Sequence, residues 1–456
     1  MGDSASKLEK ELGDEFPSDE KFCGLHNFGN TCYCNSVVQA LYYCIPFRMH
    51  LLDYTKRHRR LEMRKHLQRV GAGAKESSDG PSKRGAEESG GERGPNAMLL
   101  ALGDLFVAID SQRKRMGVLK PRDVILTLKR ENVLFRGNMH QDAHEFLNFL
   151  LNNIGEVLQA EQKAQQEKRE AKQMAQALAE SAGEIAKESD RDRDEDSDSV
   201  SDCVSDSVSD GVIHGVSHGV SERDSDKDSD SVSDGGRDSV GGWKRFPNTI
   251  GGTFVHDVFE GVLTNETRCL CCETITSRDE GFLDLSVDVE ENSSLTHCLN
   301  NFSSVETLDG GNKFYCETCC SLQEAHRRMR VKKLPKTLVV HLKRFKYVER
   351  LQRHAKVAHR VAFPFEMKLQ NTSDAADDPD RLYELFGIVA HLGVGPNQGH
   401  YISTIKSHQK WMLFDDERIE VVEPWRVKAF FGAIEGQRAR SSNCGYLLLY
   451  QAVNEA

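Results

Sequence analysis

The sequence predicts an α+β fold, because its helical patterns come early in the chain and its strand patterns come late. Three early segments repeat apolar residues at helical intervals, namely NAMLLALGDLFVAID, PRDVILTLKRENVLF and QDAHEFLNFLLNNIGEVL. After Trp243 the apolar runs are short, rich in β-branched and aromatic residues and separated by Gly, Asn, Asp or Pro, as in TLVVHLKRF, GHYISTIKS and GYLLLYQAV. This separation argues against a doubly wound parallel sheet, in which helices and strands alternate.

Residues 1–21 contain few apolar side chains, and we expect them to form a disordered tail. They include no apolar h-region, and the chain has no run approaching about 18 apolar residues, so neither a secretory signal nor a membrane span is expected. Thirteen cysteines in such a chain point to reduced thiols, metal ligands or catalysis rather than disulfides. The expected location is the cytoplasm, with the nucleus as a second candidate.

Two weakly apolar segments interrupt a folded domain that we place at 22–453. Segment 57–95 opens as a basic, helix-like stretch, decays into Gly, Ser and charged residues, and is expected to be a disordered insertion. Segment 160–242 begins with a stretch that could continue a helix and becomes an acidic, low-complexity Val-Ser-Asp repeat, which should remain disordered. Surface loops accept such insertions at little entropic cost.

The negative charge of the chain comes mostly from the second insertion. The formal net charge is −11, and residues 188–240 contribute −12 through 17 acidic and 5 basic residues. The remainder is therefore close to +1. A nucleic-acid-binding protein would carry a basic face on its folded part, so we expect no nucleic-acid partner.

The stretch FGNTCYCNSVVQALYYC places a cysteine at a predicted helix start. Gly29, Asn30 and Thr31 are typical loop and N-cap residues, and apolar residues then recur at helical intervals. Cys32 would lie in the first turn, where unpaired N–H groups and the positive end of the helix dipole stabilise a thiolate. Cys34 lies further along the helix and gains less from that field.

A histidine and two aspartates late in the chain supply the partners that a cysteine nucleophile needs. His400 follows a Gly-rich run and begins a predicted strand, and Asp415 and Asp416 end the next one. Because antiparallel neighbours place the start of one strand beside the end of the next, an aspartate should lie beside His400. It would bond one imidazole nitrogen while the other faces the thiol of Cys32. Each residue alone is more often structural, but together they fit one catalytic template.

Two C-x-x-C pairs predict a metal site. The pairs are Cys269 with Cys272 and Cys316 with Cys319. Each such turn directs two thiolates at one point, and two turns complete a closed, tetrahedral four-sulfur site for structural Zn²⁺. Two alternatives stay open, because Cys271 and Cys320 offer other registers and all six thiols could remain without metal.

These motifs together resemble the ubiquitin-specific proteases, a large group of deubiquitinating enzymes. GLHNFGNTCYCNSVVQAL is similar to the family's Cys box, GHYISTIKS with WMLFDD to its His box, and HQDAHEFLNFLL to the segment between them. The likeness covers the chain from about Phe22 to Val453, apart from the two insertions. It implies a papain-like cysteine protease fold with a thumb, a palm and fingers, and the four paired cysteines would hold zinc in the fingers.

The resemblance also implies a reaction and assigns residues to it. The bond hydrolysed would be the isopeptide or peptide bond after the C-terminal Gly of ubiquitin, through an acyl-enzyme. Cys32 would be the nucleophile, His400 the general base and then acid, and Asp415 its orienting partner. Asp416 is an alternative or additional partner of the histidine, and Asn27 would donate to the oxyanion.

Substrate binding is expected to involve the middle motif. The family uses the Asp of QDAxEF to bind the basic C-terminal tail of ubiquitin, a role that falls on Asp142, with Glu145 as a weaker candidate. A helix N-cap is the alternative role for Asp142. One departure from close relatives is His140, which stands where they usually carry Gln, and we attach no consequence to it.

The implied partners are ubiquitin, ubiquitinated proteins and an activator. The region from VLTNETRCLCCET to TLVVHLKRFKY resembles a narrower subgroup of small deubiquitinases that are activated by β-propeller partners of the WD-repeat type. This likeness implies an enzyme that is weak alone and is activated through its fingers.

Two other functions compete with this interpretation. A non-catalytic ubiquitin-binding protein would lack a member of the triad, and none is missing from the sequence. A zinc-organised scaffold would recruit partners, for example through the acidic insertion.

Overall fold

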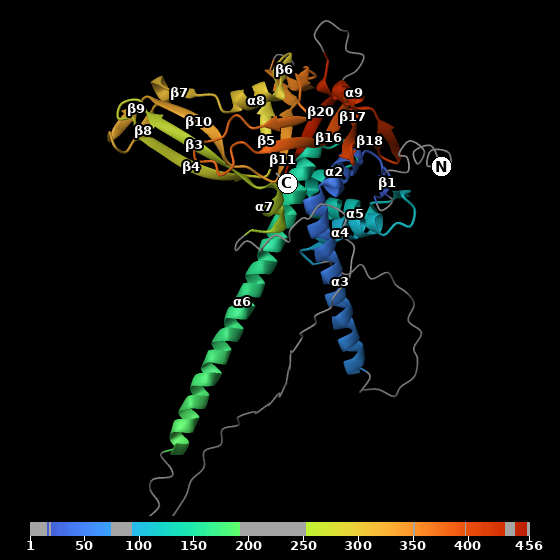
Figure 1. Cartoon of the computed structure of the whole chain (residues 1–456), viewed down its shortest axis with the longest axis vertical. Helices are drawn as coiled ribbons and strands as arrows, with labels where there is room; N and C mark the ends of the chain where they lie inside the picture. The colour runs from blue at the N-terminus through green and yellow to red at the C-terminus, as the bar shows by residue number, and fades with distance from the viewer. Residues whose placement is uncertain are drawn as a thin grey trace, which may run out of the picture. The chain divides into compact units, whose positions relative to one another are not determined.

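The computed structural model describes residues 16–17, 20–73, 94–191, 252–349, 352–396, 398–433 and 443–453. The chain divides into two compact units. One joins Met1–Gln162 with Thr249–Ala456, and the other is Lys163–Asn248, whose described part is the continuation of a helix. Both hydrophobic cores and all the predicted site residues belong to the first unit. Figure 1 labels its helices and strands.

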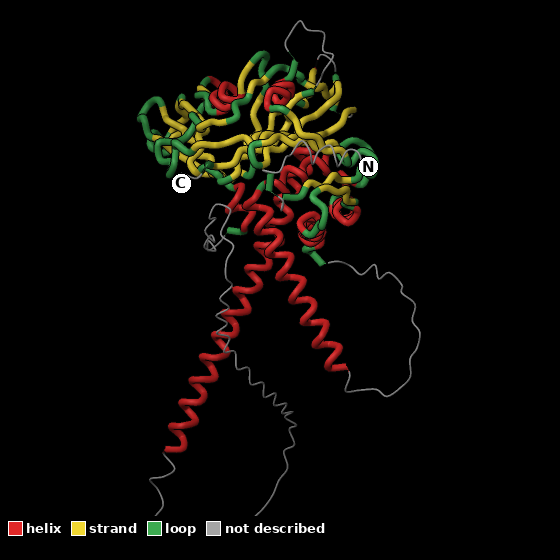
Figure 2. Tube along the Cα trace, turned by 45° about the vertical axis from the view of Figure 1, so that its right-hand side comes forward, coloured by secondary structure: helices red, strands yellow, loops and turns green. Residues whose placement is uncertain are grey.

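Helices dominate the part of the first unit that contains the expected nucleophile (Figure 2). The helices nearest to it are α2 (Cys32–Tyr43), α3 (Ile45–Gly73), α4 (Ala97–Asp110), α5 (Arg122–Glu131), the start of α6 (Ala143–Arg191) and α7 (Phe254–Phe259), with the 3₁₀ turn η1 (Val133–Phe135). The other described helices are α8 (Leu295–Phe302) and α9 (Pro424–Val427), with 3₁₀ turns η2 (Gly310–Asn312) and η4 (Lys428–Phe431). Every residue of α2 is buried, because this helix packs against both α3 and the strands β16 (Leu382–Gly395) and β17 (Gln398–Ser407). Within the described residues, no helix has the length and apolarity needed to cross a lipid bilayer.

One large sheet carries the other half of the expected site. Its strand order is β19-β18-β17-β16-β20-β11-β5, with β15 beside β16, and only β11 and β5 pair in parallel. The strands are β5 (Leu285–Asp288), β11 (Thr337–Lys343), β15 (Glu366–Lys368), β16 (Leu382–Gly395), β17 (Gln398–Ser407), β18 (Lys410–Asp415), β19 (Arg418–Val422) and β20 (Cys444–Ala452).

Both faces of this sheet are covered by apolar side chains. Along β20, Leu447 and Leu449 belong to the core shared with the helices, and Leu448 and Tyr450 belong to the core on the opposite face. Successive strand residues point to opposite faces, so a continuous apolar run such as GYLLLYQAV is what a doubly buried strand requires. The predicted α+β architecture is confirmed.

A second sheet extends the chain away from this core. Its order is β4-β3-β10-β7, and the short hairpin β8–β9 lies at its far end (Figure 1). These strands are β3 (Gly261–Cys269), β4 (Ile275–Phe282), β7 (Glu306–Leu308), β8 (Phe314–Cys316), β9 (Ser321–Gln323) and β10 (Ala325–Lys333). Three further pairs join β1 (Phe22–Leu25) with β2 (Met116–Leu119), β6 (Ser293–Ser294) with β14 (Val361–Ala362), and β12 (Phe345–Val348) with β13 (Arg353–Lys356).

A few residues of the predicted tail over 1–21 are described by the structure and contact the folded unit. Phe16 is buried, with its ring 5.6 Å from that of Phe22 and 5.3 Å from that of His408. The guanidinium of Arg115 also donates to the backbone carbonyls of Phe16 and Pro17, each at 3.1 Å. Phe16 therefore anchors this segment, and residues 1–15 and 18–19 lie outside the described residues, so their disorder stays a prediction.

The two insertions begin as helices. Helix α3 continues to Gly73, through the stretch that the sequence marked as helix-like at the start of segment 57–95. Helix α6 continues to Arg191, as the composition of the start of segment 160–242 allowed. Residues 74–93 and 192–242 of these segments lie outside the described residues, so the disorder predicted there stays a prediction.

Candidate active site

Cys32 is the first residue of α2 and is 2% exposed. This position confirms the predicted helix start. The unpaired N–H groups and the positive dipole end of a first turn favour a thiolate there. Thr31 occupies the N-cap position without making the expected side-chain cap. Its hydroxyl instead accepts a hydrogen bond from the N–H of Phe28 at 3.0 Å, which closes the loop before the helix.

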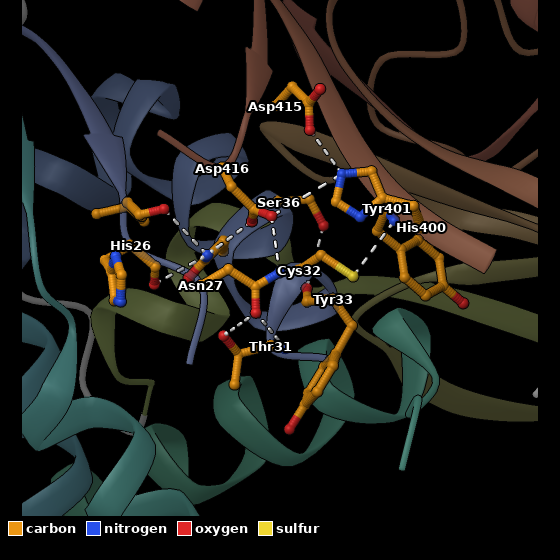
Figure 3. A network of polar contacts seen from close by, with 12 residues as sticks. His26, Asn27, Thr31, Cys32, Tyr33, Ser36, His400, Tyr401, Asp415 and Asp416 are labelled. Carbon is orange, nitrogen blue, oxygen red and sulfur yellow. Dashed lines mark hydrogen bonds and ion pairs between the residues drawn. The ribbon is translucent and has the colours of Figure 1, made fainter. Parts of the chain in front are cut away.

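His400 and Asp415 lie beside Cys32 on neighbouring strands, β17 and β18 (Figure 3). The two strands join through a tight turn at His408 and Gln409, whose φ values are 44° and 67°. Nε2 of His400 lies 2.6 Å from Oδ1 of Asp415, and the other ring nitrogen faces the sulfur. The backbone N–H that follows His400 also donates to Sγ of Cys32 at 3.4 Å.

The electrostatics of this group favour a thiolate paired with an imidazolium. Burial raises the pKa of Cys32, but the imidazoles of His140 and His400 and the backbone N–H of Tyr401 outweigh it and lower this pKa to about 7. The bond to Asp415, followed by that to Cys32, raises the pKa of His400 to about 10. Between these two values the proton resides on the imidazole. Cys34 differs, because complete burial raises its pKa well above the ordinary value.

Asp416 faces a different group from its neighbour. Its Oδ2 accepts a hydrogen bond from Nδ2 of Asn27 at 2.7 Å, and its Oδ1 accepts one from Nδ2 of Asn35 at 2.8 Å. The distance from its Oδ2 to Nε2 of His400 is 3.9 Å, beyond hydrogen-bond length. Asp415 is therefore the direct partner of the histidine, and Asp416 holds the amide of Asn27.

Both the amide oxygen and the amide nitrogen of Asn27 make hydrogen bonds that fix the loop around it. Its Oδ1 accepts from the N–H of Gly29 at 2.9 Å and from the N–H of Thr31 at 3.1 Å, so the amide nitrogen is oriented away from that loop. Just before it, Gly24 lies against the end of the β18–β19 turn. A Cβ at Gly24 would lie 2.5 Å from the backbone oxygen of Glu417, so this position accepts no larger side chain without movement of the turn.

Asp142 caps α6, which was the alternative to substrate binding. Its Oδ1 accepts from the N–H of His144 at 2.7 Å, and its Oδ2 accepts from the hydroxyl of Tyr446 at 2.5 Å. Both oxygens therefore have partners within the chain. Glu145 is largely exposed. The partial burial of its carboxylate, followed by the charge of Asp142, raises its pKa. Binding of the ubiquitin tail by these two residues stays a prediction.

His140 is a member of the site that the sequence argument missed. Its side chain is 9% exposed, and its ring stacks on that of Tyr401 with a centroid distance of 5.0 Å and an interplanar angle of 8°. It contributes to the low pKa of Cys32. The only signal in the sequence was its place two residues before Asp142, in a motif otherwise interpreted through its acids.

The four paired cysteines come together at the end of the β3–β10 sheet. Their Sγ atoms all lie within 4.8 Å of one another, and two of the separations are 4.0 Å (Cys269 to Cys319) and 3.5 Å (Cys272 to Cys316). A tetrahedral zinc site with Zn–S bonds of about 2.3 Å needs sulfurs about 3.8 Å apart, so the residues fit the metal. The alternative registers are wrong, because Cys271 and Cys320 are exposed and lie outside the group.

A second group, His144, Asp284 and His341, also brings three potential ligand atoms together. The rings of His144 and His341 are stacked with centroids 3.7 Å apart at an angle of 18°. A lone pair of imidazole lies in the plane of its ring, so one ion cannot lie in both of these nearly parallel planes. The group is a hydrogen-bonded network, in which His144 pairs with Asp284 at 2.8 Å.

Comparisons with known proteins agree with this geometry. The family model described as ubiquitin carboxyl-terminal hydrolase matches residues 23–450. Ubiquitin carboxyl-terminal hydrolase 4 of Arabidopsis thaliana is 42% identical over 453 residues, which cover 99% of this chain and 99% of that protein. Ubiquitin carboxyl-terminal hydrolase 12 of Salmo salar is also 42% identical, over 99% of this chain and 95% of that protein.

The fold has a solved counterpart. A chain in the structure of the SAGA Ubp8/Sgf11/Sus1/Sgf73 DUB module bound to ubiquitin aldehyde aligns with a TM-score of 0.56 at 20% identity, covering 96% of this chain and 71% of that one. The two match in fold, and the sequence relatives extend the match to the whole chain. The protein therefore belongs to the ubiquitin carboxyl-terminal hydrolase family and is a thiol-dependent deubiquitinating enzyme.

Proposed function

We propose that this deubiquitinase cleaves the bond after the C-terminal Gly of ubiquitin with Cys32 as nucleophile, His400 as general base and acid, and Asp415 as the orienting acid. The observation that carries the assignment is the place of the His400 imidazole, which lies between the sulfur of Cys32 and the carboxylate of Asp415 and contacts that carboxylate at 2.6 Å. These three residues come from a helix start and from two strand ends that are far apart in the chain. A cluster with a purely structural role would not need this combination of residue types and positions.

The reaction follows from the protonation states. The thiolate of Cys32 attacks the glycine carbonyl, and the imidazolium of His400 donates its proton to the departing lysine or α-amine. Asn27 has a second amide N–H beyond the one given to Asp416, and with the backbone N–H groups at the start of α2 it can donate to the oxyanion. His400, now neutral, takes a proton from water, which hydrolyses the thioester and restores Cys32.

A ubiquitin that carries a C-terminal electrophile tests this proposal directly. The chain should form a one-to-one covalent adduct, and tandem mass spectrometry of the labelled peptide should place it on Cys32. The Cys34→Ala variant is the matched control, because the buried Cys34 should be dispensable and labelling should persist. An adduct on Cys34, or labelling that survives Cys32→Ala, would refute the assignment.

Asp416 should act through Asn27 rather than through the histidine. We expect Asp416→Ala to lower kcat by about 10²–10³, the cost of losing one oxyanion donor, with little change in KM because the oxyanion forms only after substrate binds. Steady-state hydrolysis of a fluorogenic ubiquitin conjugate measures both constants. The control is Glu417→Ala at the next residue, whose half-exposed carboxylate pairs with His26 and whose loss should change kcat by no more than about two-fold. A change confined to KM would contradict this role.

The pH dependence should report the ion pair. Activity as kcat/KM is expected to rise through pH of about 7 as Cys32 ionises, and to fall through about 10 as His400 loses its proton. Asp415→Asn removes the main cause of the raised pKa of His400, so the alkaline limb should move to lower pH. An Asp415→Asn enzyme with an unmoved alkaline limb would show that this carboxylate does not orient the histidine.

The four-cysteine group would hold a structural Zn²⁺. Its support is the donor set, four thiolates at spacings that suit a tetrahedron. Such a site is closed, so the metal would fix the hairpin β8–β9 to the end of β3 and supply no reacting group. Catalysis would remain with Cys32 and His400.

An activator of the WD-repeat β-propeller type would complete this function. The support is the resemblance of the chain around the four cysteines to deubiquitinases that use such partners. Hydrolysis of a fluorogenic ubiquitin conjugate with and without a purified propeller protein tests it. We expect a rise in kcat, and an unchanged rate at saturating propeller would reject the activator.

A further inference from the structure

His140 lies in the segment that precedes α6 and is tied to the loop before the nucleophile. The side chain of Asn30 donates to the backbone oxygen of Asn138 at 2.8 Å, and the side chain of Asn138 accepts from Lys129 at 2.9 Å. These contacts connect the two loops on either side of Cys32. The position of His140 relative to the sulfur is therefore set by the fold and not by a flexible loop.

The ring of His140 is enclosed by other rings. It stacks on Tyr401, and its centroid lies 5.4 Å from that of His391. Tyr401 is the residue whose backbone N–H donates to the sulfur of Cys32. The aromatic stack therefore places the imidazole of His140 against the same short piece of β17 that contacts the nucleophile.

Neither ring nitrogen of His140 makes a close hydrogen bond with any residue that the structure describes. A neutral imidazole always carries one N–H, and a buried N–H without an acceptor costs free energy. The group toward which this ring does act is Cys32, whose pKa it lowers. A sulfur anion is the acceptor that would satisfy the donor.

The surroundings of His140 differ from those of His400 in a way that separates their roles. His400 has the carboxylate of Asp415 at 2.6 Å, which supports a positive charge on its ring. No ion pair with a carboxylate is present for His140 within the described residues, and the nearer carboxylate of Asp142 is bonded to Tyr446 and to the start of α6. The surroundings of His140 therefore do not stabilise the protonated imidazole that a general acid or base needs.

Three other ring side chains around this pocket carry no charge at neutral pH. Burial lowers the pKa of His391 to about 2 and raises that of Tyr401 well above its usual range, so both are neutral. Tyr446 on β20 is neutral for the same reason. The charged groups around the pocket are the reacting pair of Cys32 and His400, together with Asp142 and Lys356. The charge of Asp142 acts on Tyr401 and Tyr446, and that of Lys356 acts on His391.

We infer that His140 is a second imidazole at the nucleophile, which donates an N–H to the sulfur anion of Cys32 and holds it, while His400 alone carries protons. This inference rests on the proposed function, because it takes Cys32 as the reacting thiol. It predicts that the thiolate of the free enzyme depends on a donor at position 140 and not on an aromatic ring there.

Two substitutions separate the donor from the ring. His140→Phe keeps the stack on Tyr401 and removes the N–H, whereas His140→Gln keeps an N–H donor and removes the ring. The rate of alkylation of Cys32 by iodoacetamide is measured against pH, and tandem mass spectrometry distinguishes Cys32 from Cys34 in the same peptide. Thermal unfolding of each variant reports whether the fold is retained, and His140→Leu serves as a second donorless variant if His140→Phe does not fold.

We expect the donorless variant to raise the pH midpoint of alkylation by about one unit, so that the rate at pH 6 falls about ten-fold, and His140→Gln to stay within about two-fold of the wild type. The kcat/KM of the donorless variant should likewise fall more at pH 6 than at pH 9. A midpoint that is unchanged in the donorless variant, or that shifts equally in His140→Gln, would overturn the inference. Alkylation needs no ubiquitin, so this failure is distinct from failure of the proposed function, which appears as hydrolysis that survives Cys32→Ala.

Discussion

Replacement of Cys32 by alanine is expected to abolish hydrolysis of a ubiquitin conjugate, with a loss in kcat on the order of 10⁶-fold, as for removal of the nucleophile from a triad that acts as a unit. No other group can replace the sulfur. Cys34, two residues on, is completely buried and its pKa is raised, so it remains a thiol at neutral pH. Single-turnover hydrolysis of a fluorogenic ubiquitin conjugate measures the residual rate.

The matched control for this experiment is Cys34→Ala, which removes a thiol of the same helix. We expect it to retain activity within about three-fold, because a small buried residue is lost and no reacting group is touched. Binding of unmodified ubiquitin should be unchanged in Cys32→Ala, which shows that the variant is folded. Hydrolysis at more than about 1% of the wild-type rate in a folded Cys32→Ala enzyme would rule out this residue as nucleophile.

Loss of one ligand from the four-cysteine group should have the second largest effect. Cys316→Ser is expected to release zinc and unfold the end of the fingers, because structural zinc sites contribute apparent binding free energies of about 10–16 kcal/mol and no apolar core replaces them there. The strand β4 beside this group is exposed along most of its length, so it has little other support. Zinc content by metal analysis and ubiquitin affinity by titration should both fall, the affinity by at least about ten-fold.

Cys271→Ser provides the matched control, since Cys271 is an exposed cysteine of the same turn that lies outside the group. It should retain one equivalent of zinc and normal affinity for ubiquitin. Equal loss of zinc in both variants would mean that the ligand set is wrong. Full zinc loss from Cys316→Ser with unchanged ubiquitin affinity would mean that the metal does not order the surface that binds substrate.

The sequence was sufficient to place Cys32, His400 and the two aspartates in one site, because each lies at an element boundary with its own local signal. A helix start, a Gly-flanked strand start and a strand end are all set by nearby residues. The division of labour between Asp415 and Asp416 was not predictable. It depends on the backbone at Asp416, whose φ of 50° turns its carboxylate toward α2 and away from His400.

The same limit explains what else was missed. Phe16 is a single aromatic residue in a polar stretch, and only its contact with Phe22 and His408 shows that it is anchored. The C-x-x-C spacing, by contrast, named Cys272 and Cys319 correctly, although Cys271 and Cys320 left other registers open. His140 has no pattern of its own, because its partners Cys32 and Tyr401 come from other parts of the fold.

The missing side chain of Gly24 makes catalysis vulnerable at a distance from any reacting atom. A methyl group added there would press on the backbone of Glu417 and displace both acids that precede it. Misplacement of catalytic groups by about 1 Å can cost about 100-fold in rate. We expect a Gly24→Ala enzyme to fold and to bind ubiquitin, but to have a low turnover rate. Screens that measure protein abundance or ubiquitin binding would therefore not detect such a variant as defective.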